Sequence, residues 1–272
     1  MNWPVIRAVI QKDLRIAYRN RGVRIPLMLT PVLLIVGVPT FLILGAELLG
    51  GGGLTGAVAS GDAPFGGFVP SVVDAAGDTE LTYERAVLEF LVVPLYLLVP
   101  LVVATVIAAD SFAGERERRT LEALLSTATT DRELFIGKLL AAYLPAIASS
   151  WVAFAVYSVV ANLLAMRSFG APFFPTPTWL VIAFWVAPAI ALLNISLMVG
   201  ASSRVRSLQA AHQIGSLLVL PFMLLLVIQI TGVVLLDIRS MVVFGSLLWV
   251  GGLAVLLVNL RAFDRNTVAS RL

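Results

Sequence analysis

The chain has no cysteine, a single histidine and few charged residues. Of its 272 residues, 13% are charged and 59% are hydrophobic, whereas a soluble domain is typically about one quarter charged and about half apolar. So little charge cannot cover a soluble globule of this size, which excludes a soluble enzyme, a disordered chain and a nucleic-acid-binding module. The missing cysteines exclude disulfides, thiolate metal sites and cysteine nucleophiles, and one histidine cannot complete the common zinc sites.

Long charge-free runs then indicate a polytopic membrane protein. A helix needs roughly 20 apolar residues to cross about 30 Å of hydrocarbon, and six runs reach that length. The predicted spans are residues 25–49, 88–109, 139–165, 179–200, 211–236 and 240–260. We therefore predict an all-α polytopic membrane protein that forms a single transmembrane domain, residues 1–272, with an outer loop at 50–84 and a cytoplasmic loop at 110–138. Periodicity leaves open whether the region near 230–245 is re-entrant.

The basic residues predict the orientation. If residues 1–24 lie inside, 16 of the 19 lysines and arginines fall on the cytoplasmic side, where basic residues of membrane proteins collect. The opposite topology reverses this bias. Both termini are therefore expected in the cytoplasm, and the protein is expected in the cell (inner or cytoplasmic) membrane.

An amphipathic helix is predicted ahead of the first span, at residues 4–21. Apolar residues recur at helical spacing beside a polar stripe, and a helix of this kind can lie in the headgroup layer with its basic side chains on anionic lipid. The apolar positions are Ile6, Ile10, Leu14 and Ala17. The basic residues expected at the lipid interface are Arg7, Lys12, Arg15 and Arg19.

Motifs for chemistry within the chain are missing. Gly137-Lys138 is followed by leucine and lacks the earlier glycine of a phosphate-binding loop, so we expect no ATP hydrolysis through that motif and no enzyme activity in this chain. No ionisable residue lies near the middle of a span, which counts against a proton-driven carrier. The lack of a convincing internal repeat counts against a secondary transporter.

The densest charge lies in the loop between the second and third spans. Charged residues at 115–119 are followed by three leucines at helical spacing, namely Leu121, Leu124 and Leu125. Thr130 and Glu133 then form the pattern of a capping box, which starts the next helix. A short amphipathic helix rimmed by charge can dock a cytoplasmic partner. The alternative is a solvated charged loop, but exposed leucines count against it because they need burial.

This loop resembles the signature of the permease subunits of type-2 ABC (ATP-binding cassette) exporters, which loosely runs Glu-x-Glu-x-x-Gly-Thr-Leu-Glu-x-Leu-Leu and ends at a Gly-Lys pair. The matching residues are Glu115, Glu117, Thr120, Leu121, Glu122, Leu124, Leu125, Gly137 and Lys138. The chain departs from the signature at Arg119, where the family usually has glycine, and near Ala128, where proline is common. The layout of amphipathic helix, six spans and large first outer loop is similar too.

The resemblance implies a coupling helix at 119–126, seated in a cleft of a separate ATPase subunit. The residues expected to couple are Glu115, Glu117, Arg118, Arg119, Thr120, Leu121, Glu122, Leu124 and Leu125. By the same resemblance, the N-terminal helix at about 5–21 looks like the connecting helix beside that contact.

The resemblance also implies a complex of two permeases, as a homodimer or a related heterodimer, with two ATPase subunits. ATP and magnesium bind to the ATPase subunits, and no cofactor is expected in this chain. The paired permeases are expected to form the substrate pathway of an exporter. The alternative is a non-transporting subunit that transmits force or signal to an extracellular partner. Such subunits carry a large outer domain, and the loop at 50–84 is shorter than a typical domain of about 50 residues or more.

Overall fold

In a computed structural model of the chain, the described residues are 2–48, 83–117, 130–202, 205, 207–230 and 237–262. These residues form helices, and no strand occurs among them. Short π-helical turns, labelled η, continue several of the helices. In chain order the elements are α1 (Trp3–Arg19), α2 (Arg21–Pro31), η1 (Val32–Gly37), α3 (Val38–Leu48), α6 (Tyr83–Ala86), η2 (Val87–Leu91), α7 (Val92–Ala109), η3 (Asp110–Gly114), α8 (Glu115–Glu117), α10 (Asp131–Phe169), α11 (Pro177–Val181), η4 (Ile182–Val186), α12 (Ala187–Ser202), α13 (Leu208–Leu217), α14 (Leu220–Ile230) and α15 (Ile238–Ala262).

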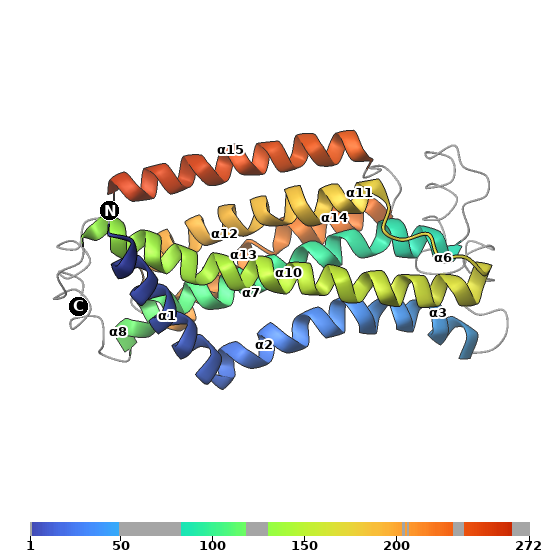
Figure 1. Ribbon diagram of the computed structural model, residues 1–272, viewed down its shortest axis with the longest axis horizontal. Helices are drawn as coiled ribbons and strands as arrows, with labels where there is room; N and C mark the ends of the chain where they lie inside the picture. The colour runs from blue at the N-terminus through green and yellow to red at the C-terminus, as the bar shows by residue number, and fades with distance from the viewer. Residues whose placement is uncertain are drawn as a thin grey trace.

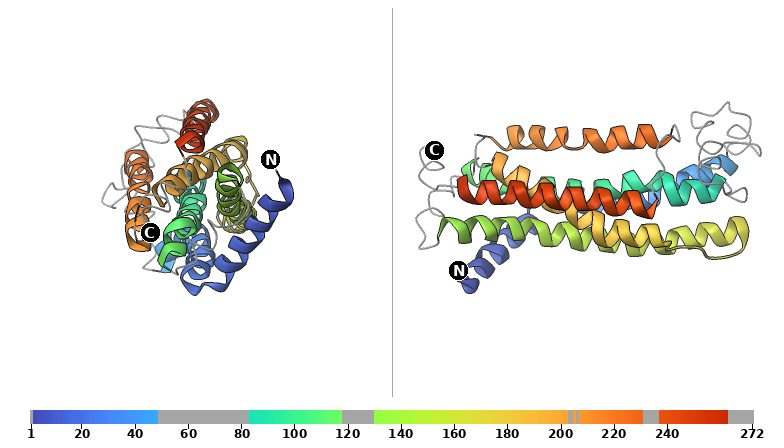
Figure 2. Two further views of the ribbon diagram at one scale, coloured as in Figure 1. Left: turned by 90° about the vertical axis from the view of Figure 1, so that its left-hand side faces the viewer. Right: turned by 90° about the horizontal axis from the view of Figure 1, so that it is seen from above.

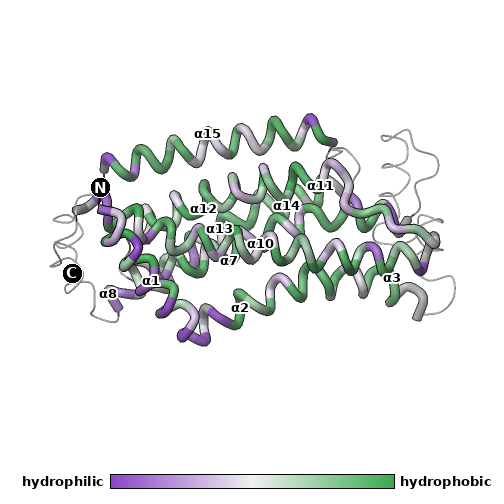
Figure 3. Tube along the Cα trace, viewed as in Figure 1, coloured by the Kyte–Doolittle hydropathy of each residue, from purple (hydrophilic) through white to green (hydrophobic). Residues whose placement is uncertain are grey.

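The long helices run side by side along one axis as a bundle (Figures 1 and 2). Within the described residues, five segments are long and apolar enough to cross a membrane: Leu27–Leu44, Val87–Ala109, Arg132–Arg167, Pro177–Ser202 and Ile238–Arg261. Apolar residues dominate the long helices, whereas polar residues gather on α1 and α8 (Figure 3). The predicted all-α polytopic membrane fold is confirmed. We refer to the two ends of the bundle as the α1 end and the α6 end.

The predicted fifth span, 211–236, coincides with two helices instead of one. Helix α13 ends at Leu217 and α14 begins at Leu220, so neither helix reaches the roughly 20 residues that a span needs. Pro221 explains the interruption, because proline has no N–H to bond the preceding turn and its ring clashes with that turn's carbonyl. Residues 231–236 lie outside the described part of the chain, so the number of spans and the possible re-entrant region stay predictions.

Helix α7 lies at the centre of the bundle (Figure 2). In the segment Val87–Ala109, 78% of the residues are buried, compared with 17% in Leu27–Leu44 and 17% in Ile238–Arg261. Helices α10 and α12 pack directly against α7, and α15 packs on the outside of α12. A displacement of α7 would therefore also displace the helices packed against it.

An aromatic cluster joins the helices in the half of the bundle toward the α6 end. The Trp179 ring lies 4.8 Å from the ring of Tyr157, 5.0 Å from that of Phe174 and 5.4 Å from that of Tyr96, measured between centroids. The indole Nε1 of Trp179 donates a hydrogen bond of 2.9 Å to the Glu89 carbonyl oxygen. Aromatic packing and hydrogen bonds between helices are two of the forces that hold helices together in a membrane.

Candidate functional site

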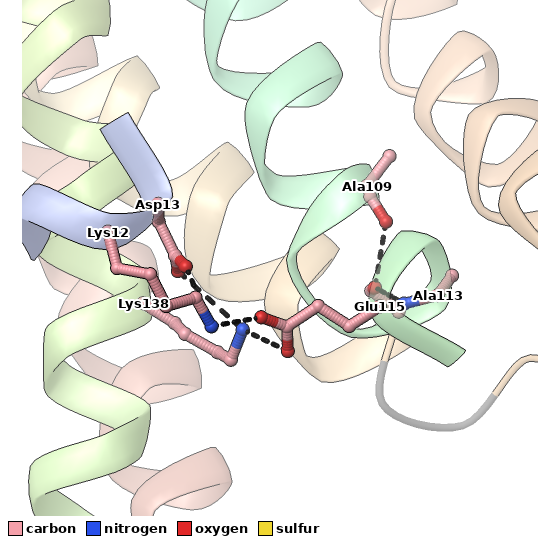
Figure 4. Close-up of polar contacts among 7 residues, drawn as sticks. Lys12, Asp13, Ala109, Ala113, Glu115 and Lys138 are labelled. Carbon is pink, nitrogen blue, oxygen red and sulfur yellow. Dashed lines mark hydrogen bonds and ion pairs between the residues drawn. The ribbon is translucent and has the colours of Figure 1, made fainter. Parts of the chain in front are cut away.

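Four charged side chains meet at the α1 end of the bundle, where α1, α8 and α10 come together (Figure 4). The Glu115 carboxylate accepts hydrogen bonds from Lys12 Nζ at 2.5 Å and from Lys138 Nζ at 2.7 Å. Asp13 lies 3.3 Å from Lys12 Nζ and 3.6 Å from Lys138 Nζ. We call Lys12, Asp13, Glu115 and Lys138 the ion cluster. It joins the loop after α7 to two other helices.

Burial makes the ion cluster sensitive to any change of charge. The side chain of Lys138 is 0% exposed and that of Glu115 is 3% exposed. Two lysines face two acids, so the cluster is neutral as a whole. Removing one charge leaves the buried cluster with an excess of the opposite charge, which typically costs several kcal/mol.

Lys12 is the most exposed member of the ion cluster. Burial alone would lower its pKa, but the charges of Asp13 and Glu115 and the hydrogen bonds to them outweigh burial, and its pKa lies above the ordinary lysine value. The pairing of Lys12 is therefore complete at physiological pH. Its stabilising contribution declines only as the pH rises through this raised pKa.

The amphipathic character of α1 explains how the ion cluster is positioned. Pro4 lies in the first turn, where its missing N–H is tolerated. The buried residues of α1 are Ile6, Val9, Ile10 and Ala17, which include three of the four predicted apolar positions. Ile6 and Ile10 pack with Ala141 of α10. Because this apolar stripe is seated on α10, the adjacent Lys12 and Asp13 reach the base of the loop.

A glycine allows α1 and α10 to approach closely. A Cβ atom on Gly137 would lie 2.9 Å from Val9 Cγ1 and 3.0 Å from Val9 Cβ. We expect Gly137→Val to push α1 away and to destabilise the protein by about 1–3 kcal/mol, as overpacking usually does. Hydrogen exchange should accelerate in residues 3–19. Gly251→Val is the control, because a Cβ there meets only Leu193 Cδ1 at 3.8 Å; equal effects of the two variants would contradict the close contact.

The start of the charged loop is also fastened to α12. Ser202 Oγ donates a hydrogen bond to the Ala109 carbonyl oxygen and accepts one from the Ala113 N–H, each at 3.0 Å. These two bonds hold η3, the π-helical turn between α7 and Glu115 (Figure 4). The base of the loop is therefore tied to α12 through Ser202 and to α1 and α10 through Glu115.

The other end of the loop is held by a capping box. Thr130 Oγ1 accepts the Glu133 N–H, and the Glu133 carboxylate accepts the Thr130 N–H. The capping box predicted from the sequence is confirmed. Glu133 also accepts a hydrogen bond from the Asn2 N–H at 2.5 Å, so the start of α1 contacts this end of the loop as well.

The structure describes only two of the predicted coupling residues, Glu115 and Glu117. Glu115 lies in the ion cluster, and Glu117 is exposed in α8. The others lie outside the described residues: Arg118, Arg119, Thr120, Leu121, Glu122, Leu124 and Leu125. Their role as a docking helix stays a prediction.

The basic residues of α1 do not behave as one set. Arg7, Arg15 and Arg19 are exposed, whereas Lys12 pairs with Glu115 and Asp13 within the protein. Sequence reasoning did not identify Asp13 or the partners of Lys138. The available signals were an acidic residue within a strongly basic helix and a lysine at the edge of an apolar run.

The described part of the chain offers no clustered set of metal ligands. There, no group of three or more His, Cys, Asp or Glu side chains is placed to hold a metal ion. In the ion cluster, lysine ammonium groups lie where a cation would have to bind the carboxylates. The arrangement is suited to mechanical connection between helices.

Comparison with known proteins identifies the family of the chain. A family model described as ABC-2 family transporter protein matches residues 7–259. No curated protein sequence matches the chain significantly. The match covers most of α1, the loop base and nearly all of the long apolar helices. The chain therefore belongs to the ABC-2 family of transporter proteins and is a multi-pass membrane component of an ABC transporter.

Proposed function

We propose that this chain is the permease subunit of an ABC exporter and that its charged loop docks on a separate ATPase subunit. The observation that carries the proposal is the position of Glu115. Its buried carboxylate ties the base of the loop to α1 and α10 at once. A docking loop must be attached to several helices, because a loop attached to a single helix transmits little motion to the rest of a bundle.

The proposed mechanism follows from these ties. Two ATPase subunits bind ATP and magnesium, close on each other and push the docked loop. Because breaking a buried ion pair costs several kcal/mol, the push moves α1, α10 and the end of α7 together. The displacement of α7 then opens a pathway between two permeases, which form a homodimer or a related heterodimer. In this proposal the α1 end and both termini lie in the cytoplasm, and the complex resides in the cytoplasmic membrane.

The docking role is tested at the leucines of the loop. We expect Leu121→Asp/Leu124→Asp to abolish assembly with the ATPase subunit, because charged side chains cannot occupy an apolar cleft without a large desolvation cost. The permease is co-expressed with its ATPase partner, and co-purification and ATP hydrolysis are measured. The purified permease alone should hydrolyse no ATP, and activity should appear only in the complex.

The matched control is Leu121→Ile/Leu124→Ile, which keeps an apolar surface and should assemble normally. Size-exclusion chromatography of each permease alone separates loss of docking from loss of folding. If the aspartate variant still assembles and hydrolyses ATP as the unmodified complex does, the docking role is wrong.

A further inference from the structure

We propose that a groove on the outside of the bundle binds an anionic glycerophospholipid, with one acyl chain in the groove and the phosphate among arginines at its mouth. The groove lies between the α2–η1 segment and α10 and has a volume of about 440 Å³. It is open to the surroundings, because the lining residues Met28 and Val152 are 59% and 64% exposed. The inference goes beyond the proposed export and does not depend on docking of an ATPase subunit.

The lining of the groove is suited to a hydrocarbon chain. Tyr18 and Ser149 are the only polar residues among the described residues that line it, and the Ser149 hydroxyl donates its hydrogen bond to the Ala146 carbonyl oxygen within α10. On the α2–η1 segment the lining runs from Leu27 to Ile35, or about 12 Å along the helix axis. One hydrocarbon leaflet is about 15 Å thick, so the groove has the length of an acyl chain in one leaflet.

The mouth of the groove, next to Leu27, lies where the apolar segment Leu27–Leu44 begins. Two arginines continue the lining face of α2 beyond this point. Residues three, four and seven positions apart share one face of a helix. Arg24 precedes Leu27 by three residues and Met28 by four, and Arg21 precedes Met28 by seven. Both arginines are exposed, and they therefore lie on the groove side of α2 at the depth expected for headgroups.

Helix α1 supplies further polar groups at the mouth. Its turn into α2 is fixed by Asn20, whose side-chain oxygen accepts the Gly22 N–H at 3.0 Å. Tyr18 lines the groove and is 48% exposed, so its hydroxyl can donate a hydrogen bond to a phosphate oxygen. Arg15 is exposed and lies three residues before Tyr18, on the same face of α1. Figure 3 shows polar residues where α1 meets α2 and apolar residues along α2 beyond that junction.

The charge at the mouth selects an anionic headgroup. Residues 14–46 contain four arginines and no acidic residue. Within the described residues, Arg15, Arg21 and Arg24 form no ion pair with an acidic side chain. Guanidinium groups bind phosphate through paired N–H donors. An anionic phospholipid supplies both this phosphate and the hydrocarbon chain, whereas a soluble phosphate supplies only the first.

The test compares two photoreactive lipids that differ only in the headgroup. Phosphatidylglycerol and phosphatidylcholine each carry a diazirine midway along one acyl chain. Each is added in trace amount to phosphatidylcholine nanodiscs that hold the full chain, and the labelled peptides are identified by mass spectrometry after irradiation. Each basic residue strengthens binding to anionic lipid about fivefold. We therefore expect phosphatidylglycerol to label the chain at least about tenfold more strongly, in residues 27–35 and 145–156.

Two results in the unmodified protein would overturn the proposal. The first is equal labelling by the two lipids, which would mean that the arginines do not select the headgroup. The second is the absence of label from residues 27–35 and 145–156, which is expected if a second copy of the chain covers the groove.

Charge variants test the mouth. Arg21→Gln/Arg24→Gln should lower labelling by phosphatidylglycerol to the level of phosphatidylcholine. Arg7→Gln/Arg261→Gln is the matched control, because it removes two positive charges from exposed positions that do not line the groove. Arg7 also lies eleven residues before Tyr18, or about 16 Å along the helix axis. If both double variants retain the same preference for phosphatidylglycerol, the arginines at the mouth do not bind the headgroup and the proposal fails.

A second pair of variants tests the groove itself. Ser149→Trp should fill the groove and abolish labelling of residues 27–35. Ser158→Trp is the matched control, because both serines are partly buried on α10 and donate a hydrogen bond to a carbonyl oxygen of their own helix, but Ser158 does not line the groove. Size-exclusion chromatography shows whether each variant is folded. A folded Ser149→Trp variant that is labelled as strongly as Ser158→Trp would place the acyl chain elsewhere and overturn the proposal.

Discussion

Glu115→Leu is expected to destabilise the protein by about 3–5 kcal/mol, the usual loss when one partner of a buried ion pair is removed. Glu115 lies within 2.7 Å of both lysine ammonium groups of the ion cluster. Without it, the fully buried Lys138 retains Asp13 at 3.6 Å within the cluster. The change is measured as the free energy of unfolding in mixed detergent micelles. Glu117→Gln is the control on the same short helix. Because the Glu117 side chain is exposed, we expect this substitution to lower the free energy of unfolding by less than about 1 kcal/mol.

A double variant separates the charge effect from general damage. Glu115→Leu/Lys138→Met removes one negative and one positive charge, and Lys12 and Asp13 remain to pair with each other at 3.3 Å. Replacing a buried ion pair by apolar residues is often neutral or even stabilising, so most of the stability should return. A double variant as unstable as Glu115→Leu would show that the lost stability does not come from the excess positive charge left in the ion cluster.

The same double variant also tests whether the ion cluster couples the ATPase subunits to the permease helices. Its helices should pack normally, but the loop base is no longer tied to α1 and α10 through Glu115. If the proposed mechanism is right, the complex with the ATPase subunit should assemble. ATP hydrolysis in the ATPase subunits should, however, no longer be coupled to movement of the permease helices. A complex that is stable and fully coupled would limit the ion cluster to a structural role.

Trp179→Ala is expected to cost about 3–5 kcal/mol, the range for truncating a large buried aromatic residue. Trp179 is 0% exposed and contacts three aromatic rings from α7 and α10 and from the segment between α10 and α11. The substitution leaves a cavity and also removes the hydrogen-bond donor to the Glu89 carbonyl oxygen. The loss should appear as a lower midpoint of thermal unfolding in detergent and a smaller free energy of unfolding.

Trp185 provides the comparison on the same helical segment. It is 43% exposed, so Trp185→Ala removes fewer packed contacts and should lower stability clearly less. Trp179→Phe should fall between the two, because it keeps a ring in the cluster but loses the indole N–H. Similar losses for Trp179→Ala and Trp185→Ala would mean that the aromatic cluster does not hold the helices together as the packing indicates.

The sequence by itself determined the class of fold, the place of the charged loop and the start of the helix after it. These features depend on local composition and spacing. Runs without charge predict membrane spans, the spacing of Ile6, Ile10 and Ala17 predicts the buried stripe of α1, and Thr130 with Glu133 predicts the capping box. Such patterns can be read because each lies within a few helical turns of one segment.

Only the tertiary structure decided which distant residues meet. Glu115 bonds Lys138 across 23 positions and Lys12 across 103 positions, and Asn194 bonds Leu101 across 93 positions. No periodic pattern encodes such pairs, because they depend on which helix faces pack together and on how far each helix is shifted along its axis. The ion cluster and the bond between Asn194 and Leu101 therefore became visible only after the helices were placed, whereas membrane insertion and the position of the loop follow from the order of the residues.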